Sequence, residues 1–116
     1  MELEKAFAMM QQNLGSALPP VMEKIYRQDP GLFASHLMGK QFAKPEGGAL
    51  DERTRVLVHL AAAVALGAEG CARAMAHRGR AIGLDREALL EAVYIARFAA
   101  ASKVLEDAEV VFDELE

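Results

Sequence analysis

The sequence predicts an all-α protein from its composition, its helical periodicity and its placement of glycine and proline. Twenty-two of the 116 residues are alanine, whereas threonine occurs once. Alanine and straight-chain side chains lose little entropy in a helix, and strand-forming residues are scarce. We therefore expect about six helices in one domain spanning residues 1–116, because this length is typical of a single domain.

Three helices are expected before residue 44. The first, over 2–14, has an apolar stripe at spacings of four, three and four and ends at Gly15. Pro20 can begin a second helix over 20–28. The Asp29-Pro30 pair supplies an N-cap and a first-turn proline for the third. The side chains expected to point inward from the third helix are Leu32, Phe33, Leu37 and Phe42.

The fourth helix is expected to be covered on all sides. A loop, Lys44–Leu50, precedes it, and Asp51 can cap it. From Val56 to Leu66 the pattern is apolar almost all round, interrupted by His59, and it ends at Gly67. A helix that is apolar all round needs cover on every face. We therefore expect it to be central or to lie against another subunit.

Two further helices complete the prediction. The fifth runs from about Glu69 to Ile82 and ends at Gly83. Asp85 can cap the sixth, whose helical pattern continues to Leu115 with an acidic exposed face. Its alanine run over 99–101 would let another backbone approach closely. With the apolar fourth helix, this pattern predicts a homo-oligomer.

Charge and cysteine content exclude several classes of protein. The formal net charge of −4 provides no basic surface for nucleic acid. One cysteine rules out an internal disulfide framework and suits a reducing cytosol. The charged start of the chain does not resemble a signal peptide, and the Val56–Leu66 run is too short to span a bilayer. We expect a cytoplasmic protein without a membrane partner.

Cys71 is the first candidate for chemistry. It lies four residues after Gly67, in the first turn of the fifth helix, where unpaired N–H groups and the helix dipole favour a thiolate. Arg73 and Arg78 add positive charge nearby. The alternative is that Cys71 is a small apolar side chain packed at a helix crossing.

His59 is the second candidate, because it interrupts an apolar helix. A buried histidine needs a hydrogen-bond partner, so His59 is either part of a proton relay or a core residue bonded to the backbone. His77 follows Cys71 by six residues, roughly 240° round the helix, so it should not reach that thiol within one subunit. No spacing matches a metal site, and neither metal nor cofactor is expected.

The order of elements resembles the carboxymuconolactone decarboxylase family, which includes the AhpD-like alkylhydroperoxidases. The segments that carry the resemblance are Leu18–Val21, Asp29-Pro30, Gly48–Asp51, Arg55, Ala65–Cys71, Gly83–Glu87 and Leu90–Val93. It covers nearly the whole chain and implies an AhpD-like helical fold. It also implies a dimer, trimer or hexamer with a site near a subunit interface.

Peroxidase members of that family carry a Cys-x-x-Cys-x-x-x-His motif and a relay glutamate on the preceding helix. By position, the two cysteines correspond to Ala68 and Cys71, the histidine to Met75 and the glutamate to Val56. An attacking and a resolving thiol are both needed for an internal disulfide. The two-cysteine mechanism is therefore not expected.

Three functions follow from the resemblance. The first is a peroxiredoxin-type antioxidant oxidoreductase that uses Cys71 alone with an external thiol reductant. The second is a catalytically degenerate member that binds a small ligand or serves as a structural homo-oligomer. The third is a lactone decarboxylase-like activity, for which the polar candidates are Arg55, Arg73, Arg78 and His59.

Overall fold

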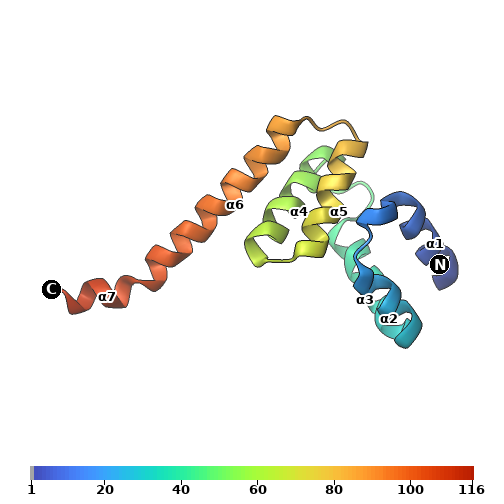
Figure 1. Ribbon diagram of the computed structural model, residues 1–116, viewed down its shortest axis with the longest axis horizontal. Helices are drawn as coiled ribbons and strands as arrows, with labels where there is room; N and C mark the ends of the chain where they lie inside the picture. The colour runs from blue at the N-terminus through green and yellow to red at the C-terminus, as the bar shows by residue number, and fades with distance from the viewer. Residues whose placement is uncertain (1) are drawn as a thin grey trace.

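The computed structural model describes residues 2–116, and within them the chain forms helices and no strand (Figure 1). The elements in order are α1 (Leu3–Leu14), the 3-10 turn η1 (Gly15–Ala17), α2 (Pro20–Gln28), α3 (Pro30–Ala43), α4 (Glu52–Leu66), α5 (Glu69–Ala81), α6 (Arg86–Asp107) and α7 (Glu109–Glu114). The all-α prediction is confirmed. The sixth expected helix is divided at Ala108 into the long α6 and the short α7.

Aspartate caps begin three of the helices, as the sequence predicts. Asp29, Asp51 and Asp85 each accept a hydrogen bond from the backbone N–H three residues later, at 3.1, 2.8 and 2.8 Å. The hydrogen bond from the Thr54 N–H lowers the pKa of Asp51. Gly67 ends α4 in the left-handed conformation with φ 77°, which an alanine adopts at a cost of roughly 1–2 kcal/mol.

Helices α1, α2 and α3 form an N-terminal unit around three aromatic rings. Phe7 stacks on Tyr26 with ring centroids 4.4 Å apart, and Phe33 meets both rings edge-on. Phe33 is completely buried. Aromatic rings bury much area and pack in such stacked and edge-on geometries, so this cluster is the core of the unit.

Helices α4, α5 and α6 form the second unit, in which α4 packs against both α5 and α6. The buried side of α4 carries Val56, Leu60 and Ala63. On α5, Gly79 is buried so closely that an added Cβ would lie 2.9 Å from Leu89. The helices therefore approach closely because small residues occupy their crossing.

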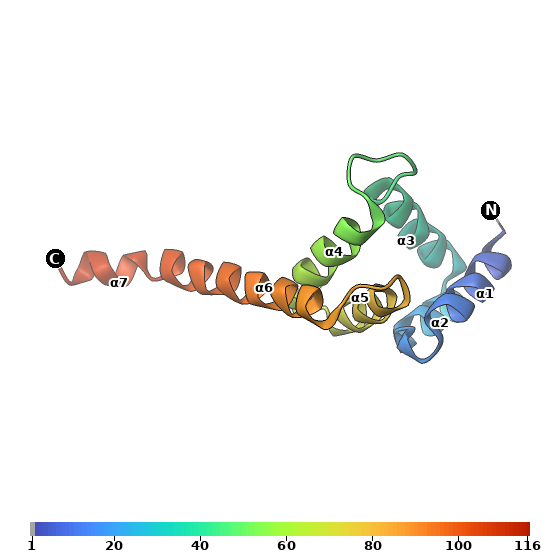
Figure 2. The same ribbon diagram turned by 90° about the horizontal axis from the view of Figure 1, so that it is seen from above.

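The N-terminal unit joins the second unit mainly through α5. Gly70, in the first turn of α5, lies against Pro19, to which an added Cβ would come within 3.0 Å. Helices α1 and η1 also contact α5. The two units consequently lie side by side, with the loop after α3 bridging to α4 (Figure 2).

The far end of the molecule is extended. The second half of α6 and all of α7 project away from the other helices in both ribbon views (Figures 1 and 2). The principal extents are 61 × 34 × 28 Å and the radius of gyration is 17.4 Å. A compact domain of this length would have a radius of about 13 Å. The α6–α7 arm therefore has little of its surface covered by its own chain.

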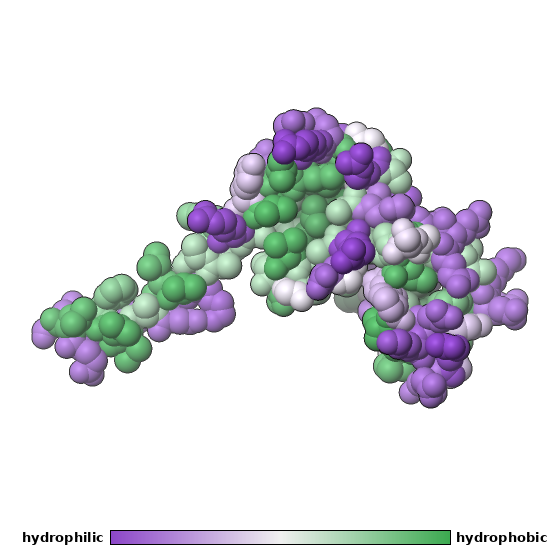
Figure 3. Space-filling view, in the orientation of Figure 1, coloured by the Kyte–Doolittle hydropathy of each residue, from purple (hydrophilic) through white to green (hydrophobic). Residues whose placement is uncertain are grey.

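Several side chains expected inside are exposed in this single chain. Phe42 and Leu32 of α3 are 89% and 52% exposed. Of the side chains expected to point inward from that helix, Phe33 is buried and Leu37 is half-buried. The all-round cover expected for α4 is absent, because Val58 and Leu66 are exposed. Apolar residues gather over α4 and along the arm in the space-filling view (Figure 3). No helix within residues 2–116 is long and apolar enough to cross a membrane.

Candidate functional site

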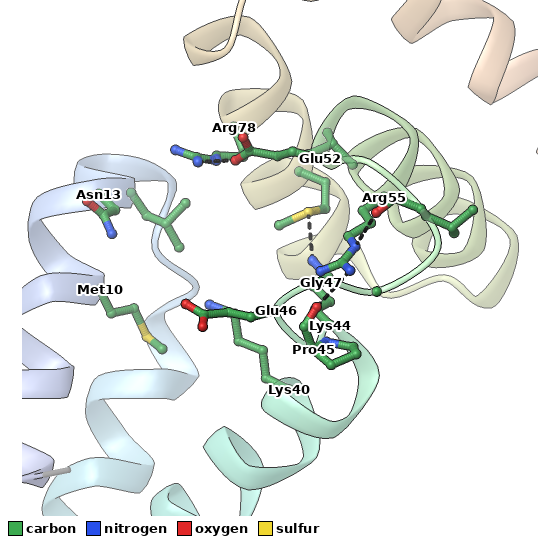
Figure 4. A pocket seen from close by; sticks show the side chains of 15 residues that line it. Met10, Asn13, Lys40, Lys44, Pro45, Glu46, Gly47, Glu52, Arg55 and Arg78 are labelled. Atoms are coloured by element: carbon green, nitrogen blue, oxygen red, sulfur yellow. Dashed lines mark hydrogen bonds and ion pairs between the residues drawn. The ribbon is translucent and has the colours of Figure 1, made fainter.

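An open pocket of about 700 Å³ lies between the N-terminal unit and the α4–α5 pair (Figure 4). Its walls come from α1, the end of α3, the loop after α3, and α4 and α5. The charged side chains that line it are Lys40, Lys44, Glu46, Glu52, Arg55 and Arg78. Four cations thus face two carboxylates, although the whole chain carries a net charge of −4.

Arg55 shapes one wall of the pocket by holding the loop after α3. Its Nε donates to the Leu50 carbonyl oxygen at 3.0 Å, and its Nη2 donates to the Pro45 carbonyl oxygen at 2.7 Å. Gly48 leaves space for the guanidinium, because a Cβ there would overlap it. Charged hydrogen bonds of this kind are stronger than neutral ones, so Arg55 fixes the loop as well as adding charge.

A second arginine lines the pocket from α5. Arg78 forms an ion pair with Glu52, which lies in the first turn of α4. Both side chains are about half exposed, so the pair contributes little to stability. The pair does neutralise one of the two carboxylates in the pocket. Lys40, Lys44 and Arg55 then face Glu46 alone, so the positive charge of the pocket remains in excess.

Lys44 is the most perturbed of the lysines. It follows the last residue of α3, is partly buried, and its Nζ donates to the Met75 thioether sulfur at 3.7 Å. Burial lowers the pKa of Lys44, and the positive charges of Lys40, Arg55 and Arg78 lower it further. Cys71 acts in the opposite direction and raises that pKa. Burial and like charges both favour the neutral amine.

Two residues that stand at the family's motif positions face this pocket. Val56 and Met75, at the glutamate and histidine positions, are both in its wall. Val56 is only 3% exposed. The pocket therefore includes two of the four positions to which the resemblance assigns active-site residues. Its polar chemistry comes from lysine and arginine instead of from an acid and an imidazole.

The cysteine expected to act there lies outside the pocket wall. Cys71 is exposed and is the third residue of α5. Ala68, at the position of the family's other cysteine, is the N-cap residue of the same helix and is also outside the wall. Within residues 2–116 no hydrogen bond joins Cys71 to His59 or His77. It precedes Met75 by four residues, so it lies about one helical turn from the pocket wall on the same face of α5.

His59 lies on α4, near enough to Lys40 and Lys44 for their charges to act on it. Burial lowers its pKa, and Lys44 and Lys40 lower it further. Its Nδ1 is buried and has no hydrogen-bond partner in the described part of the chain. One alternative for His59 was a core histidine that forms a hydrogen bond with the backbone, and Nδ1 does not form that bond. Burial and the two lysine charges therefore both disfavour the charged form of the ring.

The structure divides the four residues considered for lactone chemistry. Arg55 and Arg78 line the pocket, but Arg73 forms an i,i+4 ion pair with Glu69 along α5 and is not in its wall. His59 is not in the wall either. Two further pocket residues, Lys40 and Lys44, were not predicted from the sequence. A signal was present: the two lysines are four residues apart, which puts like charges on one helix face just before a glycine-containing loop.

The pocket as a whole is suited to holding an anion. Arginine and lysine donors bind carboxylates and phosphates through charged hydrogen bonds. Its apolar members, among them Met10, Leu14 and Leu50, would contact the carbon skeleton of such a ligand. A few convergent polar groups in a partly apolar pocket is the usual composition of a small-molecule site.

Comparisons with known proteins give a family and a fold. The model of the carboxymuconolactone decarboxylase family matches residues 32–114. The chain is also similar to the crystal structure of a protein from Methanobacterium thermoautotrophicum solved by the Northeast Structural Genomics Consortium, with a TM-score of 0.70 and 24% identity. That match covers 78% of this chain and 97% of the other. No curated protein matches the sequence significantly.

Proposed function

The chain belongs to the carboxymuconolactone decarboxylase family, and on that premise we propose that its pocket binds a small organic carboxylate. The observation that carries the proposal is the surplus of cations in a pocket lined by Val56 and Met75. The family's peroxidase chemistry needs two thiols, and this sequence has one cysteine. Ligand binding in the degenerate site is therefore the function that the geometry supports best.

The charges in the pocket explain why the ligand would be anionic. Arg78 is paired with Glu52 and Arg55 is bonded to loop carbonyls, yet Lys40 has no ion-pair partner within residues 2–116. Lys44 contacts only a neutral thioether sulfur. A carboxylate that enters the pocket would relieve the repulsion between these two lysines, and this relief would add to its affinity.

Calorimetric titration with succinate, a small dicarboxylate, tests the proposal. We expect Lys40→Met and Arg78→Met each to weaken binding by about tenfold, because each removes a charged hydrogen-bond donor worth about 1.5–3 kcal/mol at most. The matched control is Arg97→Met, an exposed arginine of α6 outside the pocket, which should bind like the native chain. Affinity should also fall as salt is raised. Absence of binding, or equal affinity in all three variants, would overturn the proposal.

One-cysteine redox activity is the second candidate function. The observation in its favour is that Cys71 is exposed and close enough to Lys44 to influence its pKa. Its test is consumption of an organic hydroperoxide with dithiothreitol as the external thiol, compared between the native chain and Cys71→Ser. Activity that depends on Cys71 would support this candidate. Equal rates in the two proteins would remove it.

We also propose that the protein is a homo-oligomer. The support is the extended shape and the exposed apolar side chains of α6 and α7, among them Phe98, Val104 and Phe112 at 72%, 67% and 52% exposure. A contiguous apolar surface of this kind is rare on monomers. Sedimentation analysis should give more than one chain per particle, and Phe98→Glu should reduce that number. Lys24→Glu, on exposed α2, is the control that should not.

A further inference from the structure

We propose that Lys44 captures the carbonyl group of a small oxo acid as a covalent imine inside the cationic pocket. The inference rests on the proposed carboxylate binding and extends it, because it names the ligand class and the residue that bonds to it. It depends on three observations: where Lys44 lies, what contacts its amine, and which charges surround it.

The position of Lys44 is suited to a reaction with a bound ligand. It lies at the junction of α3 and the following loop, and its side chain lines the pocket (Figure 4). Its Nζ contacts the Met75 sulfur at 3.7 Å, and no carboxylate pairs with it within residues 2–116. A thioether is a weak, neutral acceptor. The amine is therefore held in place without an anion that would stabilise its protonated form.

The surrounding groups favour the neutral, nucleophilic amine. Burial lowers the pKa of Lys44, and the charges of Lys40 on α3, Arg55 on α4 and Arg78 on α5 add to this effect. Cys71, also on α5, opposes it. The carboxylates in the wall are Glu52, which pairs with Arg78, and Glu46; His59 stands nearby with its own pKa lowered. Desolvation beside other cations is a known way to activate a lysine as a nucleophile.

The reaction is balanced without a cofactor. The neutral Lys44 amine adds to the carbonyl carbon of the oxo acid, and the new C–N bond gives a carbinolamine. Loss of one water molecule then forms the imine, and addition of water reverses the sequence. Nothing is oxidised or reduced in either direction. The carboxylate of the same ligand would lie against Lys40 or Arg78, which would bring the carbonyl to the amine at high effective concentration.

Reductive trapping tests the inference on the full chain. The protein is incubated with pyruvate and sodium cyanoborohydride, which reduces an imine to a stable secondary amine. The adduct adds the mass of pyruvic acid less one oxygen atom, and peptide mapping locates it. We expect Lys44 to be modified at least tenfold faster than Lys24 and Lys103, which are exposed. Excess succinate should slow the modification of Lys44 and leave those two lysines unaffected.

Two variants separate this inference from the proposed function. Lys44→Arg keeps the positive charge and removes the amine, so it should lose the fast adduct while its affinity for succinate stays within about threefold. Lys103→Arg, on the distant part of α6, should retain fast trapping at Lys44. If succinate binds but Lys44 reacts no faster than Lys24, the imine is excluded and carboxylate binding stands. If succinate does not bind, the proposed carboxylate binding is excluded. Fast trapping at Lys44 would then still support the imine, and slow trapping would exclude the imine as well.

Discussion

Cys71 and Lys44 are the two reactive side chains around α5, and the structure places them in different surroundings. Cys71 is exposed at the start of the helix, and within residues 2–116 it has no hydrogen bond to His59 or His77. Lys44 is partly buried in the pocket, contacts Met75 and lies among three other cations. The difference teaches that a side chain lining the pocket and one just outside its wall can differ in burial and in neighbouring charge, although both lie close to α5.

The largest effect expected from this difference is in ligand protection. With succinate at about 100 times its dissociation constant, about one site in 100 remains free. Acetylation of Lys44 by acetic anhydride should therefore slow by about 100-fold. Alkylation of Cys71 by iodoacetamide should keep its rate, because Cys71 is exposed outside the pocket wall. Both rates can be measured by mass spectrometry in one experiment. If succinate slowed the alkylation of Cys71 and left the acetylation of Lys44 unchanged, the ligand would bind at Cys71 and not in the pocket.

A smaller effect is expected from overpacking the helix crossing at Gly79, one turn of α5 beyond Met75. Gly79→Val should destabilise the fold by about 1–3 kcal/mol, because the added atoms meet Leu89, Leu84 and Val56. Urea denaturation measures this change. Gly39→Ala is the matched control: it has open space around it on α3 and should stabilise the fold by about 0.5–1 kcal/mol.

The same variant sharpens the comparison between the two reactive groups. In folded Gly79→Val, the rate of Cys71 alkylation should stay near that of the native chain, since the thiol is exposed already. Affinity for succinate should fall, because the wall formed by α4 and α5 is displaced. A Gly79→Val protein as stable as the native chain would show that the crossing is not tightly packed.

The smallest expected effect concerns His59 and acid. Its pKa lies below the ordinary value of 6.5 because of burial and the charges of Lys44 and Lys40. The unfolded chain therefore binds more protons than the fold as pH drops below about 6.5, and stability falls in that window until the pKa of the folded state is passed. Thermal melts from about pH 7.5 to about pH 5 should show this loss. His59→Gln should make it smaller, and an unchanged pH profile would contradict the assignment.

The helices could be predicted from the sequence because their signals are local. Asp29, Asp51 and Asp85 cap helices through N–H groups only three residues away. Gly67 ends α4 through its own positive φ. Such interactions depend on neighbouring residues alone, so they can be read from the chain without knowing its packing.

The pocket could be predicted only in part. Val56 and Met75 were placed at the site by resemblance, and both line the pocket. Lys40 and Lys44 were missed, although Lys40 shortly precedes the predicted loop and Lys44 begins it. Their role depends on facing Arg78, which is more than thirty residues away in the sequence. Nothing in the local pattern of a lysine pair distinguishes a solvated surface from one side of a cationic pocket.

By itself, the sequence determined that the chain is all-α, where most helices begin and end, and that an internal two-cysteine cycle is impossible. The tertiary structure decided which cations share a pocket, that Lys44 is desolvated and that Cys71 is exposed. It also left Phe42 and Phe98 uncovered, although their pattern is that of core residues. The reason is physical: helix formation is governed by short-range bonds, whereas burial and electrostatic coupling depend on which surfaces long-range packing brings together.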